Sequence, residues 1–156
     1  MKGNRNPREE KIKKLVETAK SLIGRPYEYG AYLNKGADKK GAFDCSSFIQ
    51  FIFGRAGVEL PRSAILQAAA PGKEISGKPG DEMRPGDVIF FEGVRGHYRH
   101  DLFYDRKIFV GHAGIFIGDG RIIHATDNIS ASGVVEQLLS ELPIPHYNIV
   151  LVKRFL

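Results

Sequence analysis

The chain has 156 residues, a length that suits one domain burying about 68–70% of the surface that its unfolded form would expose. Hydrophobic residues make up 42% of the chain, which is ordinary for a globular protein, and no apolar run approaches the roughly 18 residues of a membrane-spanning helix. One cysteine excludes an internal disulfide, so the lone thiol needs another explanation.

Positive charge is concentrated at the start of the chain. The net charge is +5, and seven Lys and Arg against three Glu give +4 over residues 1–20. Such an asymmetry attracts polyanions, either nucleic acid or an anionic cell-wall polymer. The remainder is near neutral and shows no nucleic-acid-binding motif, so we interpret the charge as a solvated helix face and expect no nucleic-acid partner.

The first twenty residues lack the apolar stretch of a secretory signal peptide. We therefore expect a cytoplasmic chain as written, and action on a cell wall would need phage-type or another non-classical delivery.

Apolar residues at helical spacing predict an amphipathic helix over residues 8–23, which packs as a cover on the core and is ended by Gly24 and Pro26. Residues 25–42 are rich in Gly, Tyr and Lys without clear periodicity, so they predict a loop. This loop leads directly into the cysteine.

Two further helices follow. Residues 46–56 are apolar over most of a helical surface, which predicts a helix buried nearly all round, with Gly57 in the left-handed position past its end. A short helix is expected over residues 63–70, before the break at Pro71 and Gly72.

The second half of the chain carries short β-rich segments separated by turn residues, at 88–91, 110–117, 121–125, 133–137 and 149–155. Helices therefore precede strands, which predicts an α+β fold with the helices packed on an antiparallel sheet. No repeat or linker divides the sequence, so we expect one domain over residues 1–156, with residues 1–24 as part of it.

Cys45 lies where the loop becomes the second helix, so we expect it in the first turn of that helix. Unpaired backbone N–H groups and the helix dipole favour an anion there, which would lower the pKa of the thiol and make it reactive. The alternative interpretation is a small buried hydrophobic residue, the usual role of a free cysteine.

Two histidines flank a predicted hairpin turn, and either could share the proton of the thiol. If Ile117 pairs with Arg121 across a three-residue loop, His112 and His124 lie on one face, roughly 7–8 Å apart at the backbone. A two-residue loop would place them on opposite faces unless a bulge intervened. Two histidines on one hairpin, downstream of a helix-terminal cysteine, therefore favour a catalytic over a structural role for the pair.

Several motifs in this order resemble the NlpC-type family of papain-like cysteine peptidases, which cleave bacterial cell-wall peptides. The resemblance spans nearly all of the chain after the first helix, and its motifs are Tyr27-Glu28-Tyr29-Gly30, Phe43-Asp44-Cys45-Ser46-Ser47-Phe48, Leu60-Pro61-Arg62-Ser63 with Gln67, Arg84-Pro85-Gly86-Asp87-Val88-Ile89-Phe90-Phe91, and Gly111-His112-Ala113-Gly114-Ile115 through His124-Ala125.

The resemblance implies a papain-like fold and a hydrolase with a Cys-His-His triad. Cys45 would attack an amide carbonyl with its own backbone N–H as an oxyanion donor, His112 would carry the proton, and His124 would occupy the third, polar position. The intermediate would be a thioester, and neither a metal nor an organic cofactor is implied.

The preferred bond of the family joins γ-D-glutamate to a diamino acid in peptidoglycan stem peptides, so the expected partner is a stem peptide or muropeptide. Tyr27, Asp44, Ser46 and Arg62 match positions that shape the substrate cleft, where Asp44 would pair with the free amine of L-alanine. The alternatives are a helix cap for Asp44 and a packed core position for Tyr27.

The sequence departs from the family at two places. Ser47 stands where the family usually has glycine, and residues 92–109 are longer than the usual connection. The long segment is either a lid or specificity loop or a solvated insertion. It contains His97, His100 and Asp101, but three mixed ligands on a loop are poor evidence for a metal.

Two other functions stay open. One is an amidase of the related cysteine-histidine type, which cuts between sugar and peptide, for example after N-acetylmuramoyl, or acts on another amide. The other is a weakly active binding or assembly module of a phage tail or secretion apparatus. The sequence decides neither the oligomeric state nor the exact stem peptide.

Overall fold

The computed structural model describes residues 6–31, 41–94, 96–143 and 146–156. These residues form an α+β fold, as predicted. The helices are α1 (Pro7–Ser21), α2 (Cys45–Arg55) and α3 (Ala64–Ala69), and the strands are β1 (Lys73–Glu74), β2 (Val88–Phe91), β3 (His112–Gly118), β4 (Arg121–Asp127), β5 (Ser132–Leu138) and β6 (Ile149–Arg154), with a 3-10 helix η2 (Leu139–Glu141) after β5.

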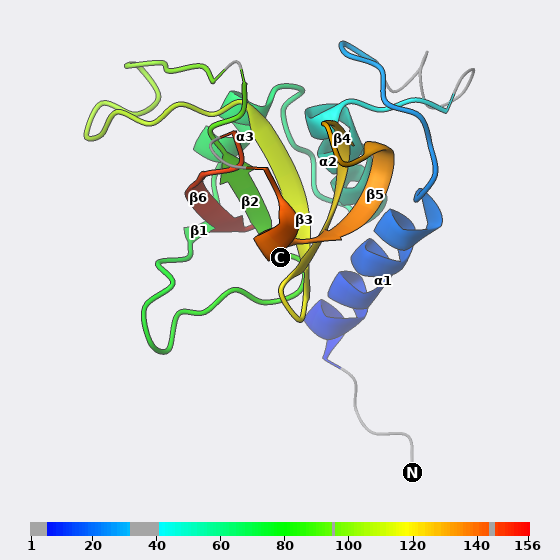
Figure 1. The fold of residues 1–156 in the computed structure, drawn as a ribbon. Coiled ribbons are helices and arrows are strands. Elements are labelled where there is room, and N and C mark those ends of the chain that lie inside the picture. The colour runs from blue at the N-terminus through cyan, green and yellow to red at the C-terminus, as the bar shows by residue number, and fades with distance from the viewer. Residues whose placement is uncertain (1–5, 32–40, 95, 144–145) are drawn as a thin grey trace.

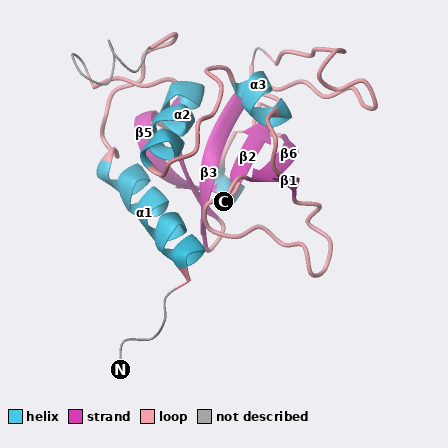
Figure 2. Cartoon of the chain, turned by 180° about the vertical axis from the view of Figure 1, so that it is seen from behind, coloured by secondary structure: helices cyan, strands magenta, loops and turns pink. Residues whose placement is uncertain are grey.

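The strands form one antiparallel sheet in the order β1-β6-β2-β3-β4-β5. The helices cover one face of this sheet, so that α2 and α3 lie in front of it in Figure 2 and behind it in Figure 1. Helix α2 contacts β3 and β4, and α1 packs against α2. The predicted helices and strands are confirmed with small shifts of their ends, whereas β1 and η2 were not predicted.

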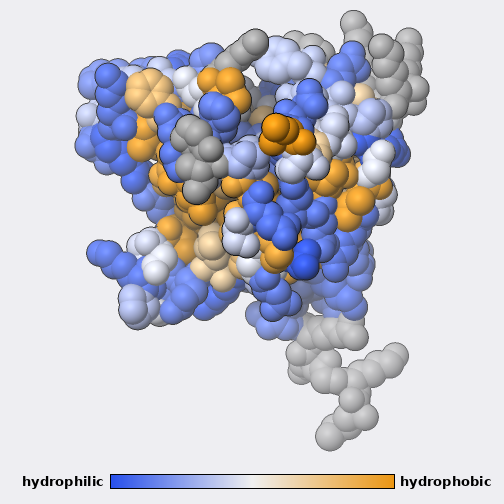
Figure 3. Space-filling model, viewed as in Figure 1, coloured by the Kyte–Doolittle hydropathy of each residue, from blue (hydrophilic) through white to orange (hydrophobic). Residues whose placement is uncertain are grey.

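Helix α1 is amphipathic, as its sequence predicts. Leu15 and Ala19 are fully buried against the core, and the side chain of Asn6 accepts the backbone N–H of Arg8 at the start of the helix (3.0 Å). In Figure 3 the region of α1, at the lower right, is mostly hydrophilic. Within the described part of the chain, no helix has both the length and the apolar character needed to cross a membrane.

Strand β2 is buried on both faces, which explains its unbroken apolar sequence. Val88 and Phe90 belong to the core beneath the helices, while Ile89 and Phe91 belong to a second cluster on the opposite face. The next strand, β3, begins at His112, which pairs with Phe91. The end of this central pair of strands therefore places a histidine at the edge of the core.

The β3–β4 hairpin has a two-residue turn with a bulge, which is one of the two arrangements that the sequence left open for histidines on one face. Ile115 pairs with Ile123, as the three-residue loop would require. The turn itself has two residues, Asp119 and Gly120, both with positive φ (53° and 69°), which is the geometry of a type I′ turn. A bulge at Ile117 takes up the extra residue, so the histidines still share a face.

The long segment over residues 92–109 leaves the sheet between β2 and β3 and reaches furthest out at the upper left of Figure 1. It is anchored at both ends and in the middle. His97 forms a two-bond antiparallel bridge with Val110 (2.9 Å each), Phe103 is buried in the core, and Arg106 pairs with Glu74. The segment is therefore packed on the domain rather than merely solvated.

Candidate active site

Cys45 is the first residue of α2, as the sequence predicts, and a reciprocal cap holds this helix end. The Asp44 carboxylate accepts the backbone N–H of Ser47 (2.8 Å), and the Ser47 hydroxyl accepts the backbone N–H of Asp44 (3.0 Å). This is a capping box with serine in the place of the usual Glu or Gln. The serine that departs from the family pattern therefore has a structural role at the thiol.

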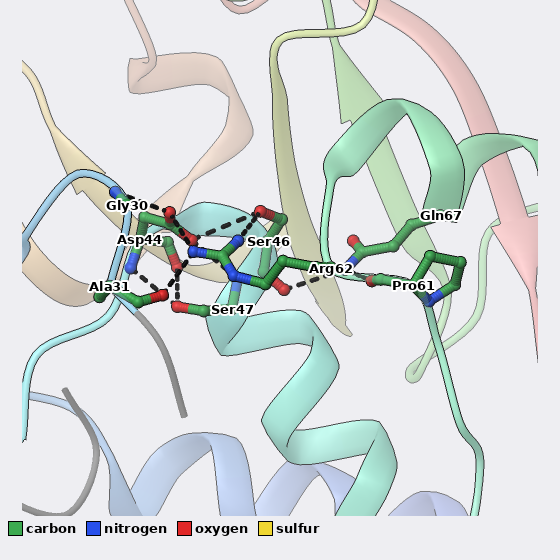
Figure 4. Close-up of polar contacts among 8 residues, drawn as sticks. All are labelled: Gly30, Ala31, Asp44, Ser46, Ser47, Pro61, Arg62 and Gln67. Carbon is green, nitrogen blue, oxygen red and sulfur yellow. Dashed lines mark hydrogen bonds and ion pairs between the residues drawn. The ribbon is translucent and has the colours of Figure 1, made fainter. Parts of the chain in front are cut away.

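A charged cluster adjoins the cap (Figure 4). Arg62 donates to the Asp44 carboxylate and to the Ser46 hydroxyl, at 2.7 Å in both cases, and also contacts the backbone oxygen of Ala31. Asp44 and Ser46 are only 7% and 6% exposed. The Gly30 N–H donates to the same Asp44 carboxylate (3.1 Å), so this carboxylate both caps α2 and fixes Arg62.

The loop that carries Arg62 is fixed by a buried amide. Gln67 donates through Nε2 to the backbone oxygens of Ser46 (2.9 Å) and Pro61 (2.8 Å). Figure 4 shows this amide on the far side of Arg62 from Asp44. The Gln67 side chain thereby links the first turn of α2 to the segment that precedes α3, and the thiol takes no part in this link.

The two predicted histidines lie in contact. His112 Nε2 and His124 Nδ1 are 2.8 Å apart, and the rings meet edge to face at 74°. His124 is fully buried and His112 is 8% exposed. Gly114 makes room for this pair, because a Cβ at that position would lie 3.2 Å from the Cβ of His124.

Two further residues complete the histidine cluster, and sequence reasoning missed both. Gln137 Oε1 lies 2.8 Å from His124 Nε2, and the ring of Tyr147 packs edge-on against both imidazoles. Gln137 belongs to a segment that was predicted as a strand, but a register between β4 and β5 would have been needed to place it beside His124. Tyr147 lies before β6 and carries no periodic signal.

Six of the seven predicted site residues line one cavity of about 280 Å³. Its lining includes Tyr27, Asp44, Cys45, Ser46, Arg62 and His112. His124 lies behind His112 and does not line this cavity. His97, from the long segment over residues 92–109, lines it as well, so that segment forms part of the site wall.

A second cavity of about 460 Å³ adjoins the first, since Tyr27 and His112 line both. Its other walls include Thr126, Asp127 and Tyr147. A still larger cavity of about 640 Å³ lies beside α1, but its lining contains neither cysteine nor histidine. The two smaller cavities therefore form one cleft, and Tyr27 and His112, which line both of them, lie at its middle.

The pKa of the thiol differs from the expectation. Burial and, to a lesser extent, the Asp44 carboxylate raise the pKa of Cys45 to about 11, although the backbone N–H groups of Ala113 and Ser46 act in the opposite direction. The prediction of a lowered pKa was therefore wrong in its net direction. The helix end does favour the thiolate, but desolvation and an adjacent carboxylate outweigh it.

Burial also keeps both imidazoles neutral. It lowers the pKa of His112 well below 6.5, with His124 as a second cause, and it lowers the pKa of His124 to about 4 even though the hydrogen bond to Gln137 acts in the opposite direction. At neutral pH the cleft thus holds a thiol, not a thiolate, beside a neutral imidazole. Burial likewise raises the pKa of the Tyr27 hydroxyl, so this group is a hydrogen-bond donor at neutral pH.

The groups that might have suggested a metal have other contacts. The Tyr98 hydroxyl lies 3.0 Å from His100 Nδ1, and Arg99 pairs with Asp101 at 2.6 Å. Among the residues that the structure describes, no three His, Cys, Asp or Glu side chains are grouped so that they could hold a metal ion.

The relatives of this chain include a DL-endopeptidase and a gamma-DL-glutamyl hydrolase. It is 36% identical over 114 residues to the bifunctional muramidase/DL-endopeptidase CwlT of Bacillus subtilis, covering 73% of this chain and 29% of CwlT. It is 34% identical over 113 residues to the gamma-DL-glutamyl hydrolase of the same organism, covering 72% and 22% of the two chains. The chain thus spans less than a third of the length of either relative.

Solved structures show the same fold. NlpC1 from Trichomonas vaginalis superposes with a TM-score of 0.70 at 24% identity, covering 92% of this chain and 44% of that one. The model of the NlpC/P60 family matches residues 24–142, which include every predicted site residue. Because that match spans well over half of its length, this chain belongs to the NlpC/P60 family.

Proposed function

We propose that this domain is a cysteine peptidase of peptidoglycan stem peptides, which cleaves the bond between γ-D-glutamate and a diamino acid. One observation carries the proposal. A thiol at a helix N-terminus opens into the same cavity as a histidine whose far ring nitrogen is already bonded to a second histidine. A nucleophile, a base and a group that orients the base are the minimum set for such catalysis.

In the proposed acylation step, Cys45 Sγ forms a bond with the carbonyl carbon while His112 Nδ1 takes the thiol proton. The carbonyl electron pair moves to oxygen, where the backbone N–H of Cys45 donates to the developing oxyanion. His112 then gives the proton to the departing amine as the C–N bond breaks. A thioester on Cys45 and a free diamino-acid amine result.

In the proposed deacylation step, water attacks the thioester and gives a proton to His112. The C–S bond breaks, the proton returns to Sγ, and a carboxylic acid leaves. Since burial raises the pKa of the thiol and lowers that of His112, we expect the histidine to act as a general base in each half of the reaction rather than as one partner of a standing ion pair.

The polar end of the cleft supports the choice of substrate. A γ-linked D-glutamate keeps its α-carboxylate free, and a preceding L-alanine presents an amine, so the acyl half carries one negative and one positive charge. The ion pair of Arg62 and Asp44 offers the complementary charges beside Cys45. The relatives named DL-endopeptidase and gamma-DL-glutamyl hydrolase support hydrolysis of a D-to-L or γ-glutamyl linkage.

The test uses the defined peptide L-Ala-γ-D-Glu-diaminopimelate with the purified protein and its Cys45→Ala variant, and reads the products by mass spectrometry. Release of L-Ala-D-Glu and free diaminopimelate by the wild type alone would support the proposal. Cleavage by both proteins would contradict the role of Cys45. Failure on this peptide with release of the lactyl end of a muropeptide would instead indicate the amidase.

A further inference from the structure

A chain of hydrogen bonds continues behind the two histidines into the β4–β5 turn. His124 Nε2 meets Gln137 Oε1 at 2.8 Å, Gln137 Nε2 donates to the Ser130 hydroxyl at 3.2 Å, and this hydroxyl donates to Asn128 Oδ1 at 2.7 Å. The chain thus joins an exposed turn to the fully buried His124.

The order of donors and acceptors along this series of hydrogen bonds is fixed at the end that lies in the exposed turn. Asn128 Oδ1 accepts the backbone N–H groups of Ser130 and Ala131, at 2.8 Å each. A backbone N–H can only donate, so the atom at this position must be the amide oxygen. The Asn128 amide nitrogen faces the other way, toward the hydroxyl of Tyr147 (3.0 Å).

The orientation of the Asn128 amide fixes the donor in each of the next hydrogen bonds toward His124. An amide oxygen carries no hydrogen, so the Ser130 hydroxyl must donate its only proton to Asn128 Oδ1. The same hydroxyl therefore accepts a hydrogen bond from Gln137 Nε2. The oxygen of the Gln137 amide is thereby turned toward His124, whose Nε2 must carry the hydrogen of that bond.

Each imidazole is neutral, because burial lowers both pKa values. A neutral His124 with its proton on Nε2 has a bare Nδ1, which can only accept. His112 must then donate from Nε2, and its own Nδ1 is left bare. The reverse orientation of the Gln137 amide would give the reverse result, with a proton on His112 Nδ1.

We propose that the turn over residues 128–131, acting through Gln137 and His124, holds His112 in the tautomer whose Nδ1 can accept a proton. Gln137 is then a positioning residue, since it contacts His124 and lines neither cavity of the cleft. The inference rests on the proposed function for its kinetic consequence, but the tautomers themselves are properties of the free protein.

The test combines imidazole ¹⁵N NMR with steady-state kinetics on the full chain. Histidine-labelled protein is measured as wild type, Gln137→Leu and Ser130→Ala, with His112→Asn and His124→Asn spectra used only for assignment. Glu136→Gln is the matched control, because Glu136 precedes Gln137 on β5 and pairs with Arg121 at the surface (3.4 Å).

We expect the Nε2–H tautomer at both histidines in the wild type and in Glu136→Gln. Gln137→Leu should mix the His112 tautomers and lower kcat about tenfold with KM little changed, which is the effect of about one hydrogen bond. Ser130→Ala should act in the same direction by about threefold, because it frees the Gln137 amide to rotate.

A wild-type His112 with its proton on Nδ1 would overturn the inference. The inference would also be overturned if the Gln137→Leu variant kept the wild-type tautomers and a kcat within twofold of the wild-type value. If the wild type does not cleave the stem peptide at all, the proposed function fails while the tautomers still decide this inference. If Gln137→Leu does not fold, Ser130→Ala and the wild-type spectrum decide it alone.

Discussion

The two sides of the cleft are built in opposite ways. The thiol side is charged, with a capping box at the start of α2 and an ion pair between Asp44 and Arg62, which lies on the loop before α3. The histidine side is neutral and buried, and its contacts join three different strands. The nucleophile is therefore placed by the end of one helix, whereas the base is placed by the register of a sheet.

The difference matters for the chemistry. Charges near the thiol do not ionise it, since burial and Asp44 raise its pKa. The neutral histidine side must therefore supply the proton acceptor during the reaction. Substitutions that separate these two contributions test whether this division of roles is correct.

The largest expected effect comes from removing the base. His112→Asn should lower kcat about 10²–10⁴-fold, the usual contribution of general acid–base catalysis, with a much smaller change in KM. His100→Gln serves as the control, because His100 is exposed on the long segment over residues 92–109. If the His112→Asn variant kept more than a tenth of the wild-type kcat, His112 would not be the general base.

The second effect concerns the resting thiol. With its pKa at about 11, Cys45 should react with iodoacetamide about 10³-fold faster at pH 10 than at pH 7, since only the thiolate reacts. The measurement is the alkylation rate of the single cysteine across this pH range. A rate that is already maximal near neutral pH would show a standing ion pair with His112 instead.

The third effect concerns stability in acid. The pKa of His124 is about 4 in the folded protein and about 6.5 in the unfolded chain, so the unfolded state binds the extra proton between these values. Stability should be fully present above pH 6.5 and fall by about 3 kcal/mol toward pH 4. His112 shifts in the same direction and adds to the loss.

Urea unfolding at pH 7, 6, 5 and 4 measures this loss, and the pH slope is compared with that of His124→Asn. In the His124→Asn variant, the pH dependence of the free energy of unfolding should correspond to about one fewer proton taken up on unfolding, whatever the stability of the variant at pH 7. Equal slopes in the two proteins would mean that His124 is not buried in its neutral form.

The smallest effect belongs to the thiol side. Ser47→Ala should lower the free energy of unfolding by about 1 kcal/mol, because the backbone N–H of Asp44 loses its acceptor. Ser21→Ala, at the exposed end of α1, should change stability by less than ~0.5 kcal/mol. Equal stabilities of the two variants would show that the serine cap contributes nothing measurable.

The same division explains what could be predicted from the sequence. Asp44, Cys45 and Gly57 mark the ends of α2 by local rules, and α2 begins and ends there. The shared face of His112 and His124 was also predicted, although the turn has two residues and a bulge rather than three residues. Short-range chemistry was sufficient for the helix ends, whereas it left the turn and the bulge of the hairpin undecided.

Long-range features were not accessible in this way. The raised pKa of Cys45 depends on how deeply the finished fold buries the thiol, which no local pattern reports. Gln137 reaches His124 only through the pairing of β4 with β5. His97 lines the site because a long segment folds back on the sheet. Such features follow from tertiary contacts that sequence spacing does not encode.

The most direct test of the central claim is to trap the acyl intermediate. The protein is mixed with L-Ala-γ-D-Glu-diaminopimelate, quenched in acid during turnover, digested and analysed by mass spectrometry. We expect an L-Ala-γ-D-Glu acyl group on the peptide that contains Cys45, and none in the Cys45→Ala variant. Product formation by the Cys45→Ala variant, or a wild-type acyl group found only at another residue, would contradict the assignment of Cys45 as the nucleophile.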